Sequence, residues 1–346
     1  MKTHIIKINP DCWNEDALQP AADTLLNGGL VAFPTETVYG LGAVYHDENA
    51  LREIFAVKGR PADNPLILHI WHVDQLDGIV ETVHPKFQRL IDRFWPGSLT
   101  LIFPKKPIVS SLVTAGLSTV AVRMPSHPVA KELLRLTNLP VAGPSANLSG
   151  KPSPTRGEHV ASDLNGKIPV IIDAGNCSAG IESTVLTFFQ GKPLVLRPGS
   201  VTREMLEDVL AETVELASLG TVDKPQAPGM KYRHYAPKAP VTLFEGSTEA
   251  IVNAINCLLT ERDPSEKTVV ICFSDSKTRY SSDLVLDLGP RSQPEIAASR
   301  LYDLLRYCDQ VEADSIFIEG LAKSGVGEAV ENRLNKAAGG NVIHVS

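Results

Sequence analysis

The segment 30–70 constrains the fold of this chain more than any other part of the sequence. A run of four apolar residues, Leu30–Phe33, predicts a short buried strand that Pro34 ends. A helix over Asp47–Val57 and a second strand over Leu66–Ile70 are predicted to follow. A strand, a helix and another strand in close succession are typical of an α/β sheet, in which ligands bind at the carboxyl ends of the strands.

Two polar loops connect these elements. Thr35–Gly42 is rich in hydroxyls and glycine, and we expect a turn there, at the carboxyl end of the first strand. Lys58–Pro65 places two cations, Lys58 and Arg60, on a backbone that prolines stiffen. Surface cations are usually just solvated, but a pair on a stiff loop beside a strand favours phosphate binding.

Two later strands each end in an arginine. Thr119–Arg123 and Leu194–Arg197 are largely apolar, and a charge at the end of such a strand either pairs with an acid or binds a ligand. Each arginine alone is explained by a salt bridge, but together with Lys58 and Arg60 they indicate an anion pocket. The loop 143–155 consists largely of hydroxyls, glycines and prolines between two predicted strands, which favours a binding loop over a linker.

The composition changes at residue 218. The segment 218–240 carries four prolines and no core periodicity, and we interpret it as a linker. Its Lys-Tyr-Arg-His-Tyr cluster at 231–235 favours a lid that closes over an anionic ligand, with nucleic-acid stacking as the alternative. The expected organisation is a first domain over 1–217, a lid over 218–240 and a smaller α/β domain over 241–346, where a strand–helix rhythm repeats.

The composition as a whole disfavours several classes of protein. With 43% hydrophobic and 21% charged residues, the 346-residue chain is an ordinary globular protein long enough for two domains. Its net charge of −7 disfavours a nucleic-acid binder driven by electrostatics. Five scattered cysteines fit free thiols in a reducing cytosol, and no apolar run suits a signal peptide or a bilayer span. We therefore expect a cytoplasmic protein without membrane contact.

No standard nucleotide-binding motif is present. GxxxxGK[ST] is missing, and no GxGxxG is completed. Gly143–Asn147 resembles a nucleophile elbow, but Asn147 stands where that motif requires glycine, which disfavours a serine hydrolase. His69 is explained by core packing as readily as by function, and no histidine has partners spaced for a metal site. Short polar residues such as Ser145 are either turn caps or ligand contacts.

Several motifs together resemble a known family. The resemblance is to the YrdC-type catalytic domain and, over nearly the whole chain, to the two-domain threonylcarbamoyl-AMP synthases. It is most specific over residues 33–199 and in the linker, whereas the C-terminal domain matches mainly by its position and length. The motifs are FPTETVYGLG (33–42), KGRPADNPL (58–66), WPGSL (95–99), VAVRMP (120–125), PSANLSG (144–150), EST (182–184), LRPG (196–199) and PGMKYRHYAP (228–237).

This resemblance implies an α/β fold in which an open, twisted, mixed sheet with helices is followed by a smaller Rossmann-like α/β domain. It implies a nucleotidyltransferase that converts L-threonine, bicarbonate and ATP, with Mg²⁺, into threonylcarbamoyl-AMP and pyrophosphate. The product would serve threonylcarbamoyladenosine modification of tRNA through a downstream tRNA threonylcarbamoyl transferase, with at most weak direct tRNA binding. No metal site of the protein's own is expected, because such a step asks mainly for positioning and charge compensation.

The resemblance also assigns roles to residues of the candidate pocket. Lys58 and Arg60 would be the catalytic residues and would hold the ATP phosphates. Tyr232 would close from the linker onto the ATP side, and Arg123 would pair with the threonine carboxylate. The full ATP-binding set is Lys58, Arg60, Asn64, Thr119, Ser145, Ser153, Arg197 and Tyr232. The threonine-binding set is Thr35, Thr37, His69, Arg123, Gly143 and Ser183.

Two alternatives stay open at this point. One is an RNA-binding module without its own chemistry, which the negative net charge disfavours. The other is an adenylate-forming enzyme that uses carbamoyl phosphate in place of bicarbonate, as the YrdC-like domains of hydrogenase maturation factors do.

Overall fold

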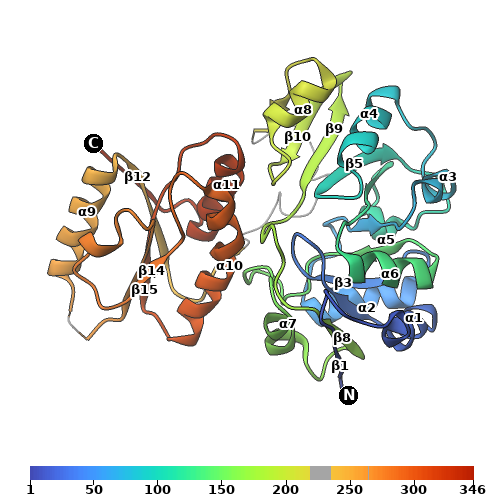
Figure 1. Ribbon diagram of the computed structural model, residues 1–346, viewed down its shortest axis with the longest axis horizontal. Coiled ribbons are helices and arrows are strands. Elements are labelled where there is room, and N and C mark those ends of the chain that lie inside the picture. The colour runs from blue at the N-terminus through green and yellow to red at the C-terminus, as the bar shows by residue number, and fades with distance from the viewer. Residues whose placement is uncertain (219–234, 264) are drawn as a thin grey trace. The chain divides into compact units, whose positions relative to one another are not determined.

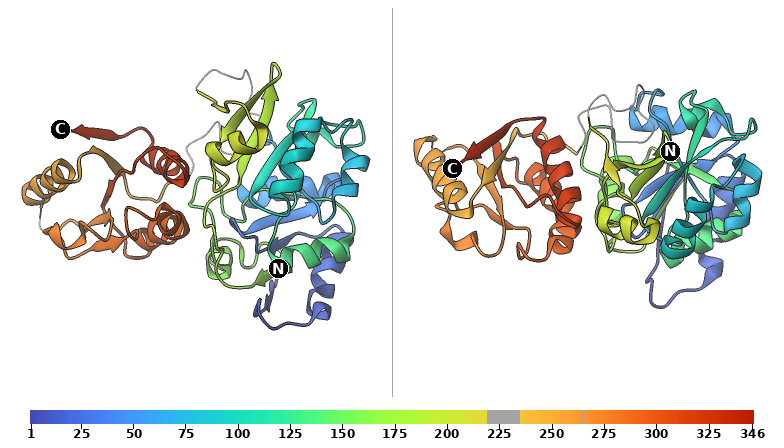
Figure 2. Two further views of the ribbon diagram at one scale, coloured as in Figure 1. Left: turned by 45° about the horizontal axis from the view of Figure 1, so that its top comes forward. Right: turned by 90° about the horizontal axis from the view of Figure 1, so that it is seen from above.

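The computed structural model describes residues 1–218, 235–263 and 265–346 (Figure 1). The segment 219–234, which includes Tyr232 and most of the predicted lid, lies outside the described residues. The described residues form two compact units, each with its own sheet (Figures 1 and 2).

The first unit is built on a large mixed sheet. Its described strands run in the order β1-β8-β2-β3-β7-β4-β6-β5-β9-β10-β11, with both parallel and antiparallel neighbours. Helix α1 packs beside α6, and α4 packs beside α8. The expected open mixed α/β sheet is confirmed. The strands are β1 His4–Lys7, β2 Val31–Phe33, β3 Gly40–Val44, β4 Ile67–His69, β5 Leu99–Pro104, β6 Thr119–Arg123, β7 Val141–Gly143, β8 Val170–Asp173, β9 Thr184–Phe189, β10 Lys192–Arg197 and β11 Glu215–Leu216.

The helices of this unit are short and mostly amphipathic. Three residues of the four-residue apolar run that opens the segment 30–70 form β2, which is buried along its whole length. The helices are η1 Glu15–Leu18, α1 Gln19–Leu26, α2 Glu48–Lys58, η2 Val73–Gln75, α3 Leu76–Ile79, α4 Pro85–Phe94, α5 Ser111–Thr114, α6 Pro128–Thr137, α7 Gly157–Leu164 and α8 Arg203–Leu210.

The expected turn over Thr35–Gly42 is wrong in its second half. Residues Gly40–Val44 form strand β3, which pairs with β2 on one side and β7 on the other. Glycine usually disfavours a strand, but here it makes room for neighbours. A Cβ on Gly42 would lie 2.6 Å from Val141 Cγ1 and 2.9 Å from the Phe33 ring. Tertiary packing therefore overrides the local propensity that predicts a turn.

Helix α2 delivers the cationic loop. The Asp47 carboxylate caps its start by accepting from the backbone amides of Asn49 and Ala50 at 3.0 Å. The helix ends at Gly59, whose φ of 60° is the left-handed conformation that glycine adopts most easily. Lys58, the last residue of the helix, is therefore fixed by regular structure, and the loop turns away immediately after it.

The second unit is a three-layer sandwich around a parallel sheet in the order β14-β13-β15-β12-β16. Helix α9 covers one face, and α10 and α11 cover the other (Figures 1 and 2). The expected smaller Rossmann-like domain is confirmed, with a last strand, β16, that the sequence pattern does not predict. The elements are β12 Val241–Gly246, α9 Thr248–Glu261, β13 Thr268–Cys272, η3 Lys277–Arg279, β14 Val285–Asp287, α10 Pro294–Gln310, β15 Ser315–Glu319, α11 Val326–Ala338 and β16 Val342–Val345.

Two further findings concern the described part of the chain. None of its helices is both long and apolar enough to cross a membrane. All five cysteines lie within it and are free, as expected, and Cys177, Cys272 and Cys308 are buried.

We predict that Gly143→Ala destabilises the first unit by about 1–3 kcal/mol, the usual cost of overpacking a filled core. A Cβ at this position would lie 2.5 Å from the backbone oxygen of Leu41, which β-sheet pairing holds in place. Gly78→Ala in α3 is the matched control, because a Cβ there meets nothing within 4 Å. Urea unfolding of both variants measures the difference. Equal stability of the two variants would contradict the close packing of β3 against β7.

Candidate active site

Three neighbouring strands bring the predicted threonine-binding residues together. Strand β4 pairs with β6 on one side, which sets His69 beside Arg123, and with β7 on the other, which sets His69 beside Val141. Gly143 lies opposite Ile67, two residues along β4 from His69. His69, Arg123 and Gly143 therefore belong to one small region of the sheet.

Arg123 is the most firmly held cation of this region. Its side chain is only 4% exposed, and Nη2 lies 2.6 Å from Glu36 Oε1. Nη1 donates to Thr37 Oγ1 at 2.7 Å, and Nε donates to the backbone oxygen of Gly97 at 3.1 Å. The guanidinium is thus fixed by the loop after β2 and by the turn before β5, with little freedom to reorient.

Glu36 is the counter-charge of Arg123 and was not among the predicted site residues. Its carboxylate also accepts from the Ser126 amide at 3.1 Å and from the Ser98 hydroxyl at 3.4 Å. Burial alone would raise the pKa of Glu36, but the Arg123 charge and these hydrogen bonds outweigh it, so the pKa lies below its ordinary value of 4.5. Glu36 is therefore ionised at neutral pH.

Arg123 keeps donor capacity despite this partner. Nη2 carries two N–H groups, and its close partner is Glu36 Oε1 at 2.6 Å. A single carboxylate oxygen engages at most one of these two N–H groups, so the ion pair leaves a donor of Nη2 unused. An unused donor on a buried, immobilised guanidinium is suited to a carboxylate ligand.

His69 is uncharged in this setting. Burial, followed by the nearby Arg123 charge, lowers its pKa to about 3. Nδ1 lies 3.4 Å from the Val141 backbone oxygen, which only accepts hydrogen bonds, and this contact favours the tautomer with the proton on Nδ1 and a lone pair on Nε2. The Phe33 ring packs edge-on against the imidazole at 5.6 Å. His69 can accept a hydrogen bond from a ligand, but it is too weak a base to remove a proton from an ammonium group.

The two threonines of the turn have different tasks. Thr35 Oγ1 donates to the Val38 oxygen at 2.6 Å and accepts from the amides of Thr37 and Val38, so it holds the turn. Because Thr35 has used its only hydroxyl proton, Thr37 must donate in the 2.8 Å contact between the two hydroxyls. The Thr37 hydroxyl therefore accepts a hydrogen bond from Arg123 and donates one to Thr35, which links Arg123 to the turn.

Ser183 and Arg197 form a second cluster beside Arg123. Thr100 lies opposite Arg123 across β5 and β6, and its hydroxyl is 2.7 Å from the Ser183 hydroxyl. Arg197, which is 3% exposed, donates to the Ser183 backbone oxygen at 3.0 Å and to its hydroxyl at 3.1 Å. Ser183 and Arg197, predicted for different ligands, are thus in direct contact.

Lys58 is tied to the loop after β7, and Arg60 is tied to the end of its own loop. Lys58 is 3% exposed, and its Nζ donates to the backbone oxygen of Ser145 at 2.5 Å and to that of Asn147. Arg60 donates to the backbone oxygens of Asn64 and Pro65 at 3.3 and 3.2 Å. Lys58 and Ser145, which are far apart in the sequence, meet as the predicted ATP-binding set requires.

The other predicted ATP-binding residues are more scattered. Ser153 donates to the Glu182 carboxylate at 2.5 Å, so both are buried as a pair. Thr119 begins β6, four residues before Arg123 and therefore about 13 Å from it along the strand. Tyr232 lies outside the described residues. The described contacts thus join Lys58 to Ser145 and Arg60 to Asn64. The parallel pairing of β6 with β4 places Thr119 at the end of β4 that follows the 58–65 loop. Ser153 is joined to Glu182, the residue before Ser183.

Asn64 carries a second buried atom without a partner. The residue is 1% exposed, and its Oδ1 accepts no hydrogen bond from any described residue. A buried acceptor of this kind normally has a hydrogen-bond donor or a cation as its partner, so a bound ligand or ion could supply one. Within the described ranges, no three His, Cys, Asp or Glu side chains cluster as metal ligands would.

Comparison with known proteins adds the family. A family model described as "Telomere recombination" matches residues 23–199, and one described as "Threonylcarbamoyl-AMP synthase, C-terminal domain" matches residues 201–339. Threonylcarbamoyl-AMP synthase of Bacillus subtilis (strain 168) is 48% identical over 333 residues, 95% of each chain. The chain belongs to the threonylcarbamoyl-AMP synthase family. It is accordingly a nucleotidyltransferase-type enzyme.

Two archaeal comparisons agree with this family. Threonylcarbamoyl-AMP synthase of Pyrococcus abyssi (strain GE5 / Orsay) is 47% identical over 327 residues, 94% of this chain and 95% of that protein. The crystal structure of P. abyssi Sua5 complexed with L-threonine superposes with a TM-score of 0.94 at 44% identity and covers 99% of this chain and 100% of that one. The fold of this synthase-family member is thus shared over both of its units.

Sequence reasoning missed the acidic partners of this synthase-family site. Glu36 stands between two threonines directly after an apolar strand, and Glu182 precedes Ser183 in a buried segment. The available signal was an acidic residue in a segment expected to be buried. A buried carboxylate needs a hydrogen-bonding or charged partner, so each such acid predicts a cation nearby. Applied to the strand-end arginines, the same rule points to Glu36.

We predict that Glu36→Gln lowers the free energy of unfolding by about 3 kcal/mol at pH 7, because it leaves the buried Arg123 charge without its partner. Glu48→Gln is the matched control: its ion pair with Arg52 is also 2.6 Å long but about half exposed, and the expected loss is below about 1 kcal/mol. Urea unfolding at several pH values measures both.

The pH dependence has a defined sign. The folded-state pKa of Glu36 is lowered, so its contribution is complete above the ordinary pKa of 4.5 and is lost as the pH falls through the folded value. The difference between the unmodified chain and Glu36→Gln should therefore shrink below pH 4.5. A difference that stays constant down to low pH would contradict an ionised Glu36.

Proposed function

We propose that this chain catalyses the formation of threonylcarbamoyl-AMP and pyrophosphate from L-threonine, bicarbonate and ATP. The names of its relatives and the L-threonine in the P. abyssi structure support this proposal. The observation that carries it is Arg123, a buried guanidinium that Glu36 holds in place and that keeps an unused donor at Nη2. A neutral His69 beside it adds an acceptor, so the two side chains suit a small molecule with a carboxylate and a hydrogen-bond donor.

The reaction divides into two bond-forming steps. The amine of threonine joins the carbon of bicarbonate to give a carbamate, with loss of water. An oxygen of the carbamate then attacks the α-phosphorus of ATP, and the bond to the β-phosphate oxygen breaks as pyrophosphate leaves. Both steps depend on holding the reactants in line and compensating negative charge, so the protein needs no nucleophile of its own.

Threonine is proposed to lie over β4 and β6. Its carboxylate would accept hydrogen bonds from Arg123, and His69 Nε2 would accept a hydrogen bond from its hydroxyl or amine. Ser183, held by Thr100 and Arg197, would contribute a hydroxyl, and Gly143 would let the ligand approach the backbone. Because its pKa is about 3, His69 would orient threonine rather than deprotonate it.

ATP is proposed to lie over the cationic loop. Lys58 and Arg60 would face its phosphates, with Asn64 and Ser145 beside them, and Arg197 would lie between the two ligands. Roles for Thr119, Ser153 and Tyr232 at the nucleotide remain part of this proposal. Lys58 also fastens the Ser145–Asn147 segment through two backbone oxygens, so it would order the loop as well as supply charge.

Mg²⁺ is proposed to enter with ATP. Oxygen atoms are its preferred ligands, and the buried Asn64 Oδ1, which accepts no hydrogen bond from the described residues, fits that preference beside Arg60. When bound, the ion would neutralise part of the phosphate charge. Asn64 would then hold the cationic loop and its ligand together.

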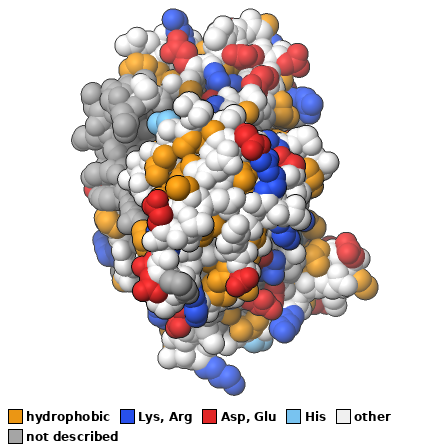
Figure 3. All heavy atoms as spheres, turned by 90° about the vertical axis from the view of Figure 1, so that its left-hand side faces the viewer, with side chains coloured by type: hydrophobic (Ala, Val, Ile, Leu, Met, Phe, Trp, Pro, Cys, Tyr) orange, Lys and Arg blue, Asp and Glu red, His pale blue; other side chains and the backbone are white. Residues whose placement is uncertain are grey.

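The product would pass to a tRNA threonylcarbamoyl transferase rather than to tRNA bound here. The chain has a net charge of −7, and the face in Figure 3 shows Lys and Arg side chains interspersed with Asp and Glu. An RNA-binding module driven by electrostatics is usually basic overall, unlike this chain. At most weak direct tRNA binding is therefore proposed.

We predict that pyrophosphate release from ATP requires both L-threonine and bicarbonate. Omitting each in turn, with Mg²⁺ present, should reduce release to background. Replacing bicarbonate with carbamoyl phosphate should not restore it. Release with carbamoyl phosphate alone would support the other adenylate-forming reaction, and steeply salt-dependent tRNA binding without any ATP turnover would support the RNA-binding module.

We predict that Lys58→Met lowers this activity by at least about 100-fold, the scale of losing one transition-state charge contact. Lys267→Met is the control, since Lys267 Nζ likewise donates to a backbone oxygen, that of Val311 at 3.3 Å, but belongs to the second unit. Its activity should stay close to that of the unmodified chain. Equal unfolding midpoints of the two variants would separate lost charge from lost folding, and normal turnover in Lys58→Met would contradict the assignment.

A further inference from the structure

The parallel sheet of the second unit contains a topological switch point that the proposed function does not use. From β13 the chain continues outward to its neighbour β14, whereas from β15 it crosses to the opposite edge at β16. The chain therefore leaves the adjacent strands β13 and β15 in opposite directions. In open α/β sheets, ligands bind at the carboxyl ends of the strands at such a point.

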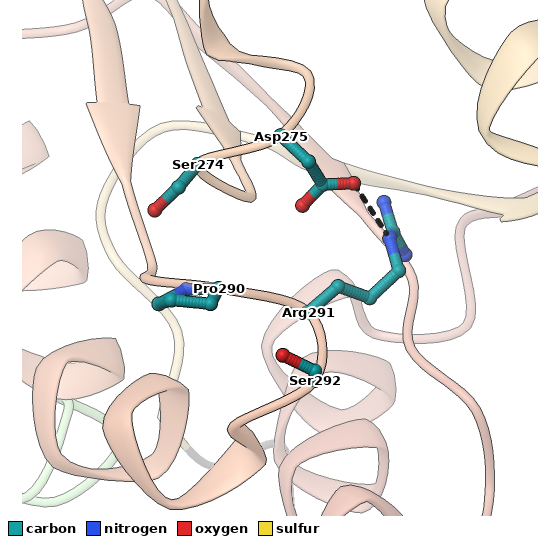
Figure 4. Close-up of a pocket in the computed structure, with 5 residues that line it drawn as sticks. All are labelled: Ser274, Asp275, Pro290, Arg291 and Ser292. Carbon is teal, nitrogen blue, oxygen red and sulfur yellow. Dashed lines mark ion pairs between the residues drawn. The ribbon is translucent and has the colours of Figure 1, made fainter.

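A cavity of about 690 Å³ lies at this carboxyl edge. Ser274 and Asp275, which follow β13, line one side, and Pro290, Arg291 and Ser292, which follow β14, line the other (Figure 4). The volume is in the usual range for small-molecule sites. Both walls are loops that begin directly at strand ends, so the sheet fixes where they start.

Arg291 is fixed from several sides within the cavity wall. Its Nη2 donates to Glu319 Oε2 at 2.6 Å and its Nη1 to the Gly320 backbone oxygen at 2.9 Å. The guanidinium carbon lies 4.3 Å from the centre of the Phe273 ring. Such an arrangement leaves the guanidinium in one orientation before any ligand arrives, which reduces the entropy cost of binding.

The glutamate that holds Arg291 is itself fully engaged. Glu319 is the last residue of β15, is completely buried, and also accepts from the Phe273 amide at 3.1 Å and from the Tyr280 hydroxyl. The Glu319 carboxylate therefore accepts hydrogen bonds from three groups, of which Arg291 is one. Asp287, the other acid at a strand end, accepts from the Ser274 hydroxyl and the Gly289 amide at 2.8 Å.

One donor of Arg291 is left for a ligand. Nε is buried and finds no hydrogen-bond acceptor among the described residues. The nearest acid, Asp275, lies 3.6 Å from it, beyond hydrogen-bond distance, and its side chain is half exposed (Figure 4). A half-exposed carboxylate in a loose ion pair is easily displaced by a better acceptor. The oxygen of an incoming anion would take its place.

We propose that this cavity binds a small phosphate ester, with its phosphate group on Arg291 Nε beside the Ser292 hydroxyl and its organic part against Pro290. A phosphate offers acceptors in several directions, which suits a guanidinium and a hydroxyl that approach from different sides. The cavity is far larger than a simple inorganic anion needs, so the ester group has room. This site is separate from the candidate active site and does not rest on the proposed reaction.

The test is an NMR titration of the full chain, observed at the Arg291 Nε–H and at the amides of Ser274 and Ser292. These local signals distinguish this cavity from any nucleotide bound in the first unit. Inorganic phosphate, AMP and acetate are the probes. AMP should shift the signals at a lower concentration than phosphate, and acetate should shift them least. No shift with any probe, or equal shifts with acetate and AMP, would overturn the proposal.

Two variants and a control sharpen the test. Asp275→Asn removes the competing carboxylate and should tighten AMP binding at least threefold; weaker binding would overturn the proposal. Arg291→Gln should abolish it. Arg262→Gln is the control, because Arg262 is similarly exposed, ion-paired with Glu266 and packed on Phe317, but it lies where β13 and β15 begin. AMP binding should be unchanged in this control, and its loss there would overturn the assignment to Arg291.

Discussion

The buried ion pair between Glu36 and Arg123 is the contact on which the candidate active site depends. Glu36 comes from the loop after β2, and Arg123 comes from the end of β6. Neither charge is stable in the core without the other. Their pairing therefore fixes the hydroxyl-rich turn over the sheet. The same pairing lowers the pKa of His69 through the Arg123 charge, after the larger effect of burial, and so keeps that imidazole neutral.

The cationic half of the site follows a different physical rule. Lys58 is the last residue of α2, and its ammonium group is buried against backbone oxygens of the loop after β7. A buried ammonium group needs such donor–acceptor contacts, so the loop and the helix end order one another. The Glu36–Arg123 pair joins elements in the first half of the site, and Lys58 joins α2 to the backbone of the loop after β7 in the second. That difference suits the proposed ligands, an amino acid on one side and a polyanion on the other.

The sequence predicted the parts of this protein that local chemistry decides. Apolar runs located β2, β4 and β6, and a helical apolar pattern located α2. A proline-stiffened loop pointed to Lys58, and the end of an apolar strand pointed to Arg123. It did not predict β3, because the local pattern around Gly40 and Gly42 is typical of a turn. In the fold, the Phe33 ring and Val141 occupy the space beside these glycines, which is why glycines stand in a strand here. Nor did it give the partner of Arg123, since only the fold brings the loop after β2 over β6. Long-range packing and long-range charge pairing are what a local pattern omits.

The central claim is that Arg123, oriented by Glu36, presents an unused donor to the carboxylate of threonine. The most direct measurement compares the dissociation constants of L-threonine and L-threoninol by calorimetry, because the two ligands differ only in that carboxylate. Losing a hydrogen bond to a charged group costs about 1.5–3 kcal/mol, so L-threoninol should bind at least about tenfold more weakly. Equal affinity for the two ligands would contradict the account.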